Sequence, residues 1–449
     1  MKPALALLLA LSVLTGGLLA GAASAVLEER DAVTIRAETL YGDPAAAEGI
    51  RVTAYTGDDQ RHLFWRADLP ADRPEEASIT YAFSQLAKRD DYPSVSDTDL
   101  RINLPNVGMS SSSPLEEAEL GPLAPLLEVA RDAGADEDHP LTLRVGDYLE
   151  WLPLEVSVDW GGVRNYSDEY SPLTILFRDY FRIPVPENLT AEVSVETGGN
   201  GEIYGYNCYT SGYYGLECDL VEREDELLFA IAPSDDAVSL DVSQVPGGWG
   251  VYRLTGTSEN DAALATVYSI PNGGIALRLL ENADGSLLLF TVEGDMVVLT
   301  TLDGETFAPT QRMELFPWED EYTWVSCFQL EGGKLALFSF AGPFLVLTPQ
   351  GAGGWSVEFQ GDASIQYDLN CGPQYDDSLN TTLLYDGERL VMTAPFNDNW
   401  FGTSFYLAVY RPDGLAYLGS YTTSQPPGGC RQLYSFRPSQ ELAWAETDS

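Results

Sequence analysis

Only two histidines, His62 and His139, occur among the 449 residues, and this limits the chemistry open to the chain. A zinc site with three histidine ligands is impossible, and the H-E-x-x-H pattern of zinc proteases is absent. The chain also lacks a G-x-S-x-G nucleophile turn, a phosphate-binding loop and a G-x-G-x-x-G segment that opens a helix. The sequence therefore predicts no catalytic residue, no cofactor and no bound metal.

Carboxylates are the most abundant reactive groups, and some form runs such as Asp136-Glu137-Asp138. Paired carboxylates hydrolyse glycosides in some proteins and bind calcium in others. Asn282-Ala-Asp284-Gly285 matches part of a calcium-binding loop but stands where a hairpin turn is expected. Because 69 acidic residues make chance neighbours common, calcium binding is left open as an alternative.

The five cysteines are Cys208, Cys218, Cys327, Cys371 and Cys430, and none forms a C-x-x-C pair. Zinc-ribbon and thioredoxin-type sites are therefore not indicated. Cys208 and Cys218 flank a segment rich in Gly and Tyr, so in an oxidising compartment they are candidates for a hairpin disulfide worth roughly 2–3 kcal/mol. Two buried thiols are the alternative, and the pairing of the other three cysteines is open.

Phe181-Arg182-Ile183-Pro184 resembles the F/Y-R-I-P sequence of sialidases, whose arginine holds the substrate carboxylate. Thr301-Leu-Asp-Gly-Glu-Thr-Phe307 is similar to their Asp-box turn, S-x-D-x-G-x-T-W, but is one residue shorter. The resemblance implies a sialidase-like glycoside hydrolase with Arg182 as a ligand contact. The sequence departs from the family after Pro184, where no G-T-L-L-A strand follows, and it contains no second Asp-box.

The formal net charge is −45, from 24 basic and 69 acidic residues. A field of this sign repels phosphate backbones and anionic lipids, which argues against nucleic-acid and membrane-surface partners. Lysine occurs only at positions 2, 88 and 334. Solubility and coding bias explain the acidity, with a salt-adapted source or a cationic partner as alternatives. The 45% hydrophobic and 11% aromatic content predicts a folded chain.

Residues 1–25 have the pattern of a cleavable signal peptide. Met1-Lys2 is followed by an apolar stretch, Ala4–Leu19, and by the small residues Ala23-Ser24-Ala25. We expect cleavage after Ala25, no membrane insertion afterwards, and a soluble secreted protein. A transmembrane anchor is the alternative, whereas the absence of a cysteine at the cleavage point argues against a lipoprotein.

Residues 26–185 are expected to form an N-terminal β-rich or α+β region. Its predicted strands lie between turn residues, at Gly49–Tyr55, His62–Leu69, Ser78–Phe83, Leu141–Val145 and Leu154–Trp160. A helix is predicted from Pro125 to Ala133, since proline suits a first helical position and Gly134 can end the helix. Gly108–Pro114, with four consecutive serines, predicts an exposed loop.

Residues 186–449 contain four similar strand-like segments at intervals of about 50 residues. They are Glu226–Phe229, Leu287–Phe290, Leu335–Phe338 and Arg389–Met392, and the last three are followed by second strands at Asp295–Thr301, Pro343–Thr348 and Ser404–Tyr410. This spacing and the nearly continuous apolar runs predict β-propeller blades, five to seven in number. A pair of β-sandwiches is the alternative.

Leu40–Ile50 and Pro246–Arg253 resemble segments of uncharacterised exported proteins of Gram-positive bacteria, which implies secretion and no specific activity. Tyr204, Tyr206 and Tyr209 lie near the cysteine pair, and exposed aromatics can stack on sugars or anchor peptides. We therefore predict a secreted, non-catalytic β-propeller protein that binds a peptide, a glycan or an envelope component. A sialidase-like hydrolase and a structural envelope protein are the alternatives, and the oligomeric state is open.

The predicted disulfide is tested by peptide mapping of the secreted protein without reduction. We expect one cross-linked peptide that contains both Cys208 and Cys218. Recovery of Cys208 as an alkylated thiol would contradict the bridge.

Overall fold

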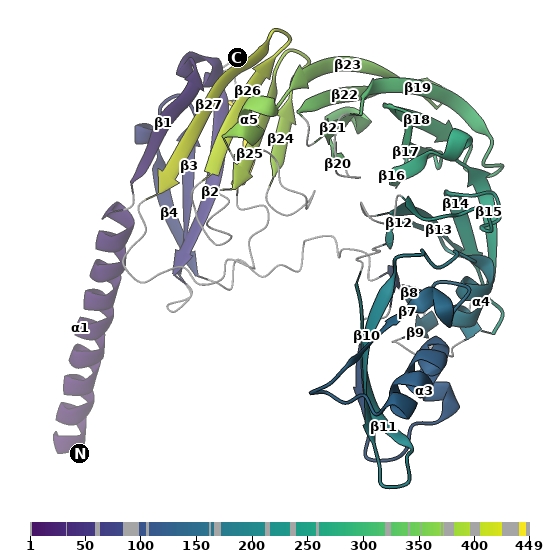
Figure 1. Cartoon of the computed structure of the whole chain (residues 1–449). Helices are drawn as coiled ribbons and strands as arrows, with labels where there is room; N and C mark the ends of the chain where they lie inside the picture. The colour runs from purple at the N-terminus through teal and green to yellow at the C-terminus, as the bar shows by residue number, and fades with distance from the viewer. Residues whose placement is uncertain are drawn as a thin grey trace. The chain divides into compact units, whose positions relative to one another are not determined.

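The computed structural model gives a chain made mostly of β-strands (Figure 1). It describes residues 2–32, 34–58, 63–83, 98–104, 107–160, 163–165, 172–211, 216–233, 239–256, 260–318, 325–339, 342–351, 353–369, 371, 381–395, 405–423 and 440–445. Of the residues named above, those that lie outside these ranges are Met1, His62, Lys88, Ser404 and Cys430.

Four times within the described residues, four strands that follow one another along the chain form one antiparallel meander. The first two are β12 (Leu216–Glu222), β13 (Glu226–Pro233), β14 (Gly250–Thr255), β15 (Ala263–Ser269), and β16 (Ile275–Glu281), β17 (Leu287–Glu293), β18 (Met296–Leu302), β19 (Pro309–Pro317). The other two are β20 (Val325–Gln329), β21 (Leu335–Ser339), β22 (Pro343–Gln350), β23 (Gly354–Asp362), and β24 (Thr382–Tyr385), β25 (Leu390–Pro395), β26 (Phe405–Arg411), β27 (Gly414–Thr423). This is the construction of propeller blades, so the predicted mostly β, blade-like fold class is confirmed.

The four repeated segments of the sequence are the second strands of these meanders: β13, β17, β21 and β25. The second strands predicted after them correspond to β18, β22 and β26. Every residue of β17 and β21 is buried. Burial on both faces of the strand explains why the apolar runs are continuous rather than alternating.

The chain divides into two compact units. Residues 1–92, 326–349 and 356–449 form the first unit, and residues 93–325 and 350–355 form the second. The predicted region boundary at residue 185 falls inside the second unit. A division of the chain at that boundary stays a prediction.

In the first unit, strands near the N-terminus pair with strands near the C-terminus. β1 (Ile35–Gly42) pairs with β27 from Ile35↔Thr423 to Gly42↔Tyr417 (Figure 1). β28 (Gln440–Trp444) pairs with β2 (Ile50–Asp58), which continues to β3 (Leu63–Pro70) and β4 (Ser78–Phe83). Each sheet therefore depends on a strand from the opposite end of the sequence.

All five strands predicted in the N-terminal region are present, as β2, β3, β4, β7 (Leu141–Arg144) and β8 (Glu155–Trp160). The predicted helix is α3 (Ala124–Ala133), which ends at Gly134 with φ 69°. The helix α4 (Pro172–Tyr180) was not predicted. Its nine residues are few, and the β-branched Thr174 and Ile175 weaken the helical signal.

Two long strands and one short strand that lie together in the second unit also escaped prediction. β10 (Thr190–Thr197), β11 (Ile203–Thr210) and the short β6 (Val107–Ser110) form, with β7, a sheet of order β6-β11-β10-β7, here called the insert sheet. The loop predicted from Gly108 therefore begins only after Ser110, because Gly108–Ser110 pair with β11. Helix α3 packs against β10.

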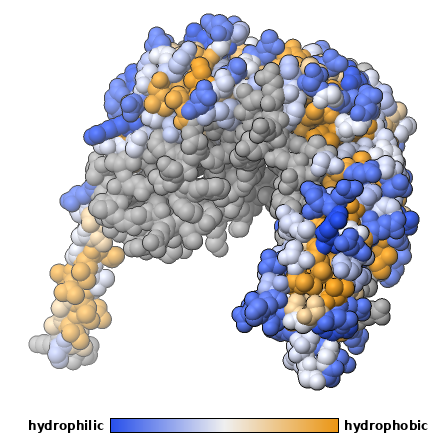
Figure 2. Space-filling view, in the orientation of Figure 1, coloured by the Kyte–Doolittle hydropathy of each residue, from blue (hydrophilic) through white to orange (hydrophobic). Residues whose placement is uncertain are grey.

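The seven-stranded sheet extends the β12–β15 meander with β5 (Asp99–Asn103), β8 and β9 (Val163–Asn165). Helix α1 (Lys2–Ala32) precedes all of these strands. Its segment Pro3–Ala25 is long and apolar enough to cross a membrane, and its side chains are exposed (Figure 2). A signal sequence at an N-terminus has the same properties, so the helix is consistent with the predicted signal; cleavage after Ala25 stays a prediction.

Arg223, in the turn between β12 and β13, joins two meanders of the second unit. Its guanidinium donates to Glu281 Oε1 at 2.7 Å, Glu226 Oε1 at 3.0 Å, the Gly304 carbonyl at 2.8 Å and the Gly285 carbonyl at 2.9 Å. Glu281 lies on β16, and the two glycines lie in the turns that follow β16 and β18. The Arg223 guanidinium therefore donates hydrogen bonds to groups of both meanders.

Turn cations also make such contacts within the first unit. Lys334, before β21, donates to Glu358 Oε1 of β23 at 2.7 Å and lies 5.0 Å from the ring centroid of Tyr385. Arg389, before β25, donates to the Glu48 carbonyl at 2.9 Å and lies 4.5 Å from the Trp444 ring centroid. Basic residues are few, and these three connect strands of different sheets.

We predict that Arg223→Ala lowers the free energy of unfolding by about 3 kcal/mol, because several acceptors lose a charged donor in a mostly buried site. Arg131→Ala is the control, since the Arg131 guanidinium pairs with its exposed neighbour Asp132 on helix α3. Urea unfolding followed by circular dichroism measures both variants. Equal unfolding midpoints for Arg223→Ala and the wild type would refute the role of Arg223 in joining the two meanders.

The hydrogen bond from Lys334 holds the pKa of Glu358 below its usual range. A depressed folded-state pKa adds stability that is present above the unfolded pKa and is lost as pH falls through the folded pKa. We therefore expect Lys334→Met to destabilise the protein at neutral pH, and the difference from wild type to shrink in acid below the ordinary carboxyl range. Thermal midpoints across pH measure this, and a pH-independent difference would exclude the linkage.

Candidate functional site

Arg182, the contact implied by the sialidase resemblance, is exposed and follows α4 directly. Its Nε donates to the Asp179 carbonyl at 3.2 Å, which satisfies the end of the helix. The flanking Phe181 and Ile183 are buried, and the Phe181 ring lies 4.9 Å from that of Tyr252. Packing thus accounts for two of the four motif residues, and a ligand contact at Arg182 stays a prediction.

The segment similar to an Asp-box forms the turn between β18 and β19. Asp303 Oδ1 accepts hydrogen bonds from the Glu305 amide at 3.2 Å, the Thr306 amide at 2.8 Å and the Thr306 hydroxyl at 2.7 Å. These donors, the Thr306 hydroxyl first, lower the pKa of Asp303. The aspartate organises a turn, and the turn carbonyl of Gly304 binds Arg223.

Cys208 is buried on β11, and Cys218 is half-buried on β12. β11 pairs with β10 and β6, whereas β12 pairs with β13 and β5, so the two strands are not the arms of one hairpin. The expected hairpin is therefore wrong, because the chain passes from one sheet to another between these cysteines. The disulfide between them stays a prediction.

No group of three or more His, Cys, Asp or Glu side chains suited to a metal occurs among the described residues. The segment that partly matched a calcium loop forms the turn between β16 and β17. There Asp284 Oδ1 accepts from the Ser286 amide at 3.0 Å and from its hydroxyl at 2.6 Å. Its carboxylate is used by the hairpin, as the sequence indicated.

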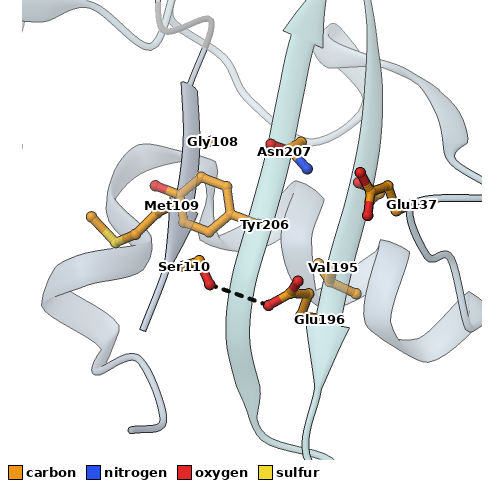
Figure 3. A pocket seen from close by; sticks show the side chains of 9 residues that line it. Gly108, Met109, Ser110, Glu137, Val195, Glu196, Tyr206 and Asn207 are labelled. Atoms are coloured by element: carbon orange, nitrogen blue, oxygen red, sulfur yellow. Dashed lines mark hydrogen bonds between the residues drawn. The ribbon is translucent and has the colours of Figure 1, made fainter. Parts of the chain in front are cut away.

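A cavity of about 240 Å³ lies on the insert sheet (Figure 3). Its lining comes from three neighbouring strands and the segment after α3: Gly108, Met109, Ser110, Glu137, Ser194, Val195, Glu196, Tyr206 and Asn207. No Lys, Arg or His is among these residues. This cavity is the candidate functional site.

Strand register fixes the arrangement of the polar side chains. Ser194 is opposite Asn207, which is opposite Gly108, and this row runs across β10, β11 and β6. Two residues along, Glu196 is opposite Gly205, which is opposite Ser110. Cross-strand partners and residues two apart share one face of a sheet, so both rows present their side chains on the same face.

The two glycines leave the space into which their polar neighbours lean. A Cβ atom at position 108 would lie 2.2 Å from Asn207 Oδ1, and one at position 205 would lie 2.8 Å from Glu196 Oε2. The Glu196 carboxylate thus extends across Gly205, toward the Ser110 hydroxyl at 3.4 Å (Figure 3). Larger residues at these two positions would displace the side chains that define the site.

Ser194 is the deepest polar residue of the lining, with 6% of its surface exposed. Neither its hydroxyl nor the Asn207 amide has a hydrogen-bond partner among the described residues. Neither group is a fully buried atom, so solvent reaches both from the cavity. These groups are therefore available to a polar ligand.

Other cavities have polar groups that are already bonded. A cavity of about 460 Å³ runs along β15, where Tyr180 Oη accepts from the Thr266 amide at 2.6 Å. The Thr266 hydroxyl donates to the Pro246 carbonyl at 2.6 Å. The insert-sheet cavity differs because the side chains of Ser194 and Asn207 have no such partners in the part of the chain that the structure describes.

Sequence reasoning identified two parts of this cavity but did not connect them. Glu137 belongs to the acidic run noted above, and Tyr206 to the tyrosine cluster. Ser194, Asn207 and Gly108 have no motif that marks them. Only the pairing of β10 with β11 and of β11 with β6 brings them together.

No protein-family model and no curated protein sequence matches the chain. Solved structures with similarity are β-propeller proteins. Virginiamycin B lyase from Staphylococcus aureus, in an inactive form with quinupristin, shares 12% identity at a TM-score of 0.23, covering 55% of this chain and 69% of the lyase. A luciferin-regenerating enzyme shares 10% identity at 0.24, covering 88% and 99% of the two chains.

A protein from Lactobacillus plantarum shares 11% identity at a TM-score of 0.28, with 84% of this chain and 97% of that chain covered. The TM-scores of all three structures lie below 0.5, so they carry no information on activity. Function therefore rests on the side chains of this chain.

Proposed function

We propose that this chain is an exported, non-catalytic binding protein that holds an extracellular glycan in the insert-sheet cavity. The observation that carries the proposal is the hydroxyl of Ser194, a residue only 6% exposed, beside the Asn207 side-chain amide, both without partners among the described residues. A hydroxyl donates and accepts, and so does an amide group. A molecule rich in hydroxyl groups complements such a surface.

The lining disfavours other ligand classes. Its two carboxylates, Glu137 and Glu196, repel anions, and no lining cation offsets them. The mixture of serine, asparagine and glutamate does not suit a purely apolar molecule. The polar groups of the cavity would lose their water without gaining hydrogen bonds. Met109, 39% exposed, offers apolar surface for the C–H face of a sugar ring.

Export is supported by the exposed apolar segment of α1. A binding role is favoured over hydrolysis because Arg182 is engaged with the end of its own helix and Asp303 with its own turn. A sialidase-like hydrolase remains the competing proposal. Hydrolysis of a sialoside by the purified protein would establish that alternative.

We predict that the secreted protein binds at least one neutral oligosaccharide in a glycan screen, and that Asn207→Ala weakens this binding about tenfold through loss of a hydrogen bond. Glu192→Gln is the control, because Glu192 lies exposed on β10 but outside the cavity lining. Titration calorimetry gives the affinities. Absence of carbohydrate binding, or equal binding by Asn207→Ala, would refute the proposal.

A further inference from the structure

We propose that the glycan bound in this cavity carries a primary ammonium group beside its hydroxyls, as an amino sugar does. This inference rests on the proposed function and specifies its ligand. It starts from the contrast between the cavity carboxylates and other carboxylates of the chain.

Carboxylates that lie deep in the structure have cationic partners. Asp219 accepts from Arg278 Nε at 2.9 Å, and Glu293, whose side chain is 3% exposed, accepts from Arg312 Nη2 at 3.0 Å. The exposed Glu358 also pairs with a cation, Lys334. With only 24 basic residues against 69 acidic ones, cations are scarce and stand at these positions.

The cavity carboxylates have no cation among the described residues. Within the described parts of the chain, Glu196 accepts from the Ser110 hydroxyl at 3.4 Å, and the Glu137 side chain makes no hydrogen bond or ion pair. Both side chains are exposed, whereas Ser194 is buried. The site therefore has two negative charges toward solvent and neutral hydrogen-bonding groups at depth.

Figure 3 shows Glu137 and Glu196 both labelled at the cavity, with the Asn207 amide on the central strand between β6 and β10. A ligand that spans these groups needs a cation for the carboxylates and hydroxyls for Asn207 and Ser194. An amino sugar has both within one ring. Charge-assisted hydrogen bonds from its ammonium would be stronger than those from a neutral hydroxyl.

Two other cationic ligands fit less well. A divalent metal needs more oxygen ligands than these two carboxylates supply, and no group of three metal-binding acidic, histidine or cysteine side chains exists in the described residues. A lysine side chain presents one ammonium on an apolar stem. It would offer no hydroxyl to the Ser194 side chain.

The test compares glucosamine, N-acetylglucosamine and glucose oligomers of equal length by titration calorimetry with the secreted protein. We expect the glucosamine oligomer to bind at least about tenfold more tightly than the other two. Its advantage should fall when the salt concentration rises, because screening weakens charge pairing between accessible groups.

The charge of the whole protein attracts any cation, so variants must locate the effect. Glu137→Gln and Glu196→Gln should each reduce the preference for the glucosamine oligomer over the glucose oligomer. Glu192→Gln removes an equal charge from the same sheet outside the cavity and should preserve the preference. Circular dichroism melting curves establish that each variant is folded.

Equal affinity for the three oligomers would overturn the ammonium inference and leave the proposed glycan function standing. Binding of none of them, together with no other carbohydrate, would overturn both. Tight binding of a lysine-rich peptide in place of the glucosamine oligomer would overturn both as well. A preference that Glu137→Gln and Glu196→Gln do not change would attribute the effect to net charge and overturn the inference.

Discussion

The connection between the meanders of the second unit depends on a small number of cations that pair with its carboxylates. Arg223 donates to two carboxylates and two turn carbonyls, and thereby connects the β12–β15 meander to the β16–β19 meander. Asp219 and Arg278 make a second link between β12 and β16. Burial raises the pKa of Asp219, and this effect opposes the hydrogen bonds from Arg278 and the Leu279 amide. The meanders are therefore joined by polar contacts as well as by apolar side chains.

A cation occupies the same turn in three of the meanders. Arg223, Lys334 and Arg389 all stand in the turn between the first and second strands, and each reaches a group on another sheet or an outer strand. A cation placed there is constrained by two strands, so less side-chain freedom is lost when it forms contacts. Use of the few cations in structural roles is consistent with the absence of a basic residue from the described lining of the insert-sheet cavity.

How far the sequence predicts this structure depends on the range of the interactions. The second strands of the meanders were predictable because burial on both faces leaves runs such as Leu335–Phe338 without polar residues. Helix α3 was predictable because Pro125 and Gly134 mark its ends locally. The cavity was not, since Gly108 and Asn207 are neighbours only through the register of β6 and β11. The supposed cysteine hairpin failed for a related reason: strand partners, not loop composition, decide where a chain turns back.

The pairing of β1 with β27 and of β28 with β2 bears on the proposed export. β27, the partner of β1, and β28, the partner of β2, lie some four hundred residues away in sequence. Contacts at such separation form late, because the entropy of closing a long loop must be overcome before they stabilise the chain. Neither of these two sheets is complete until the strand from the opposite end of the sequence has paired with it. A chain exported in an unfolded state from its N-terminus would therefore complete this unit only after its last strands have crossed, which is compatible with a signal helix that directly precedes β1.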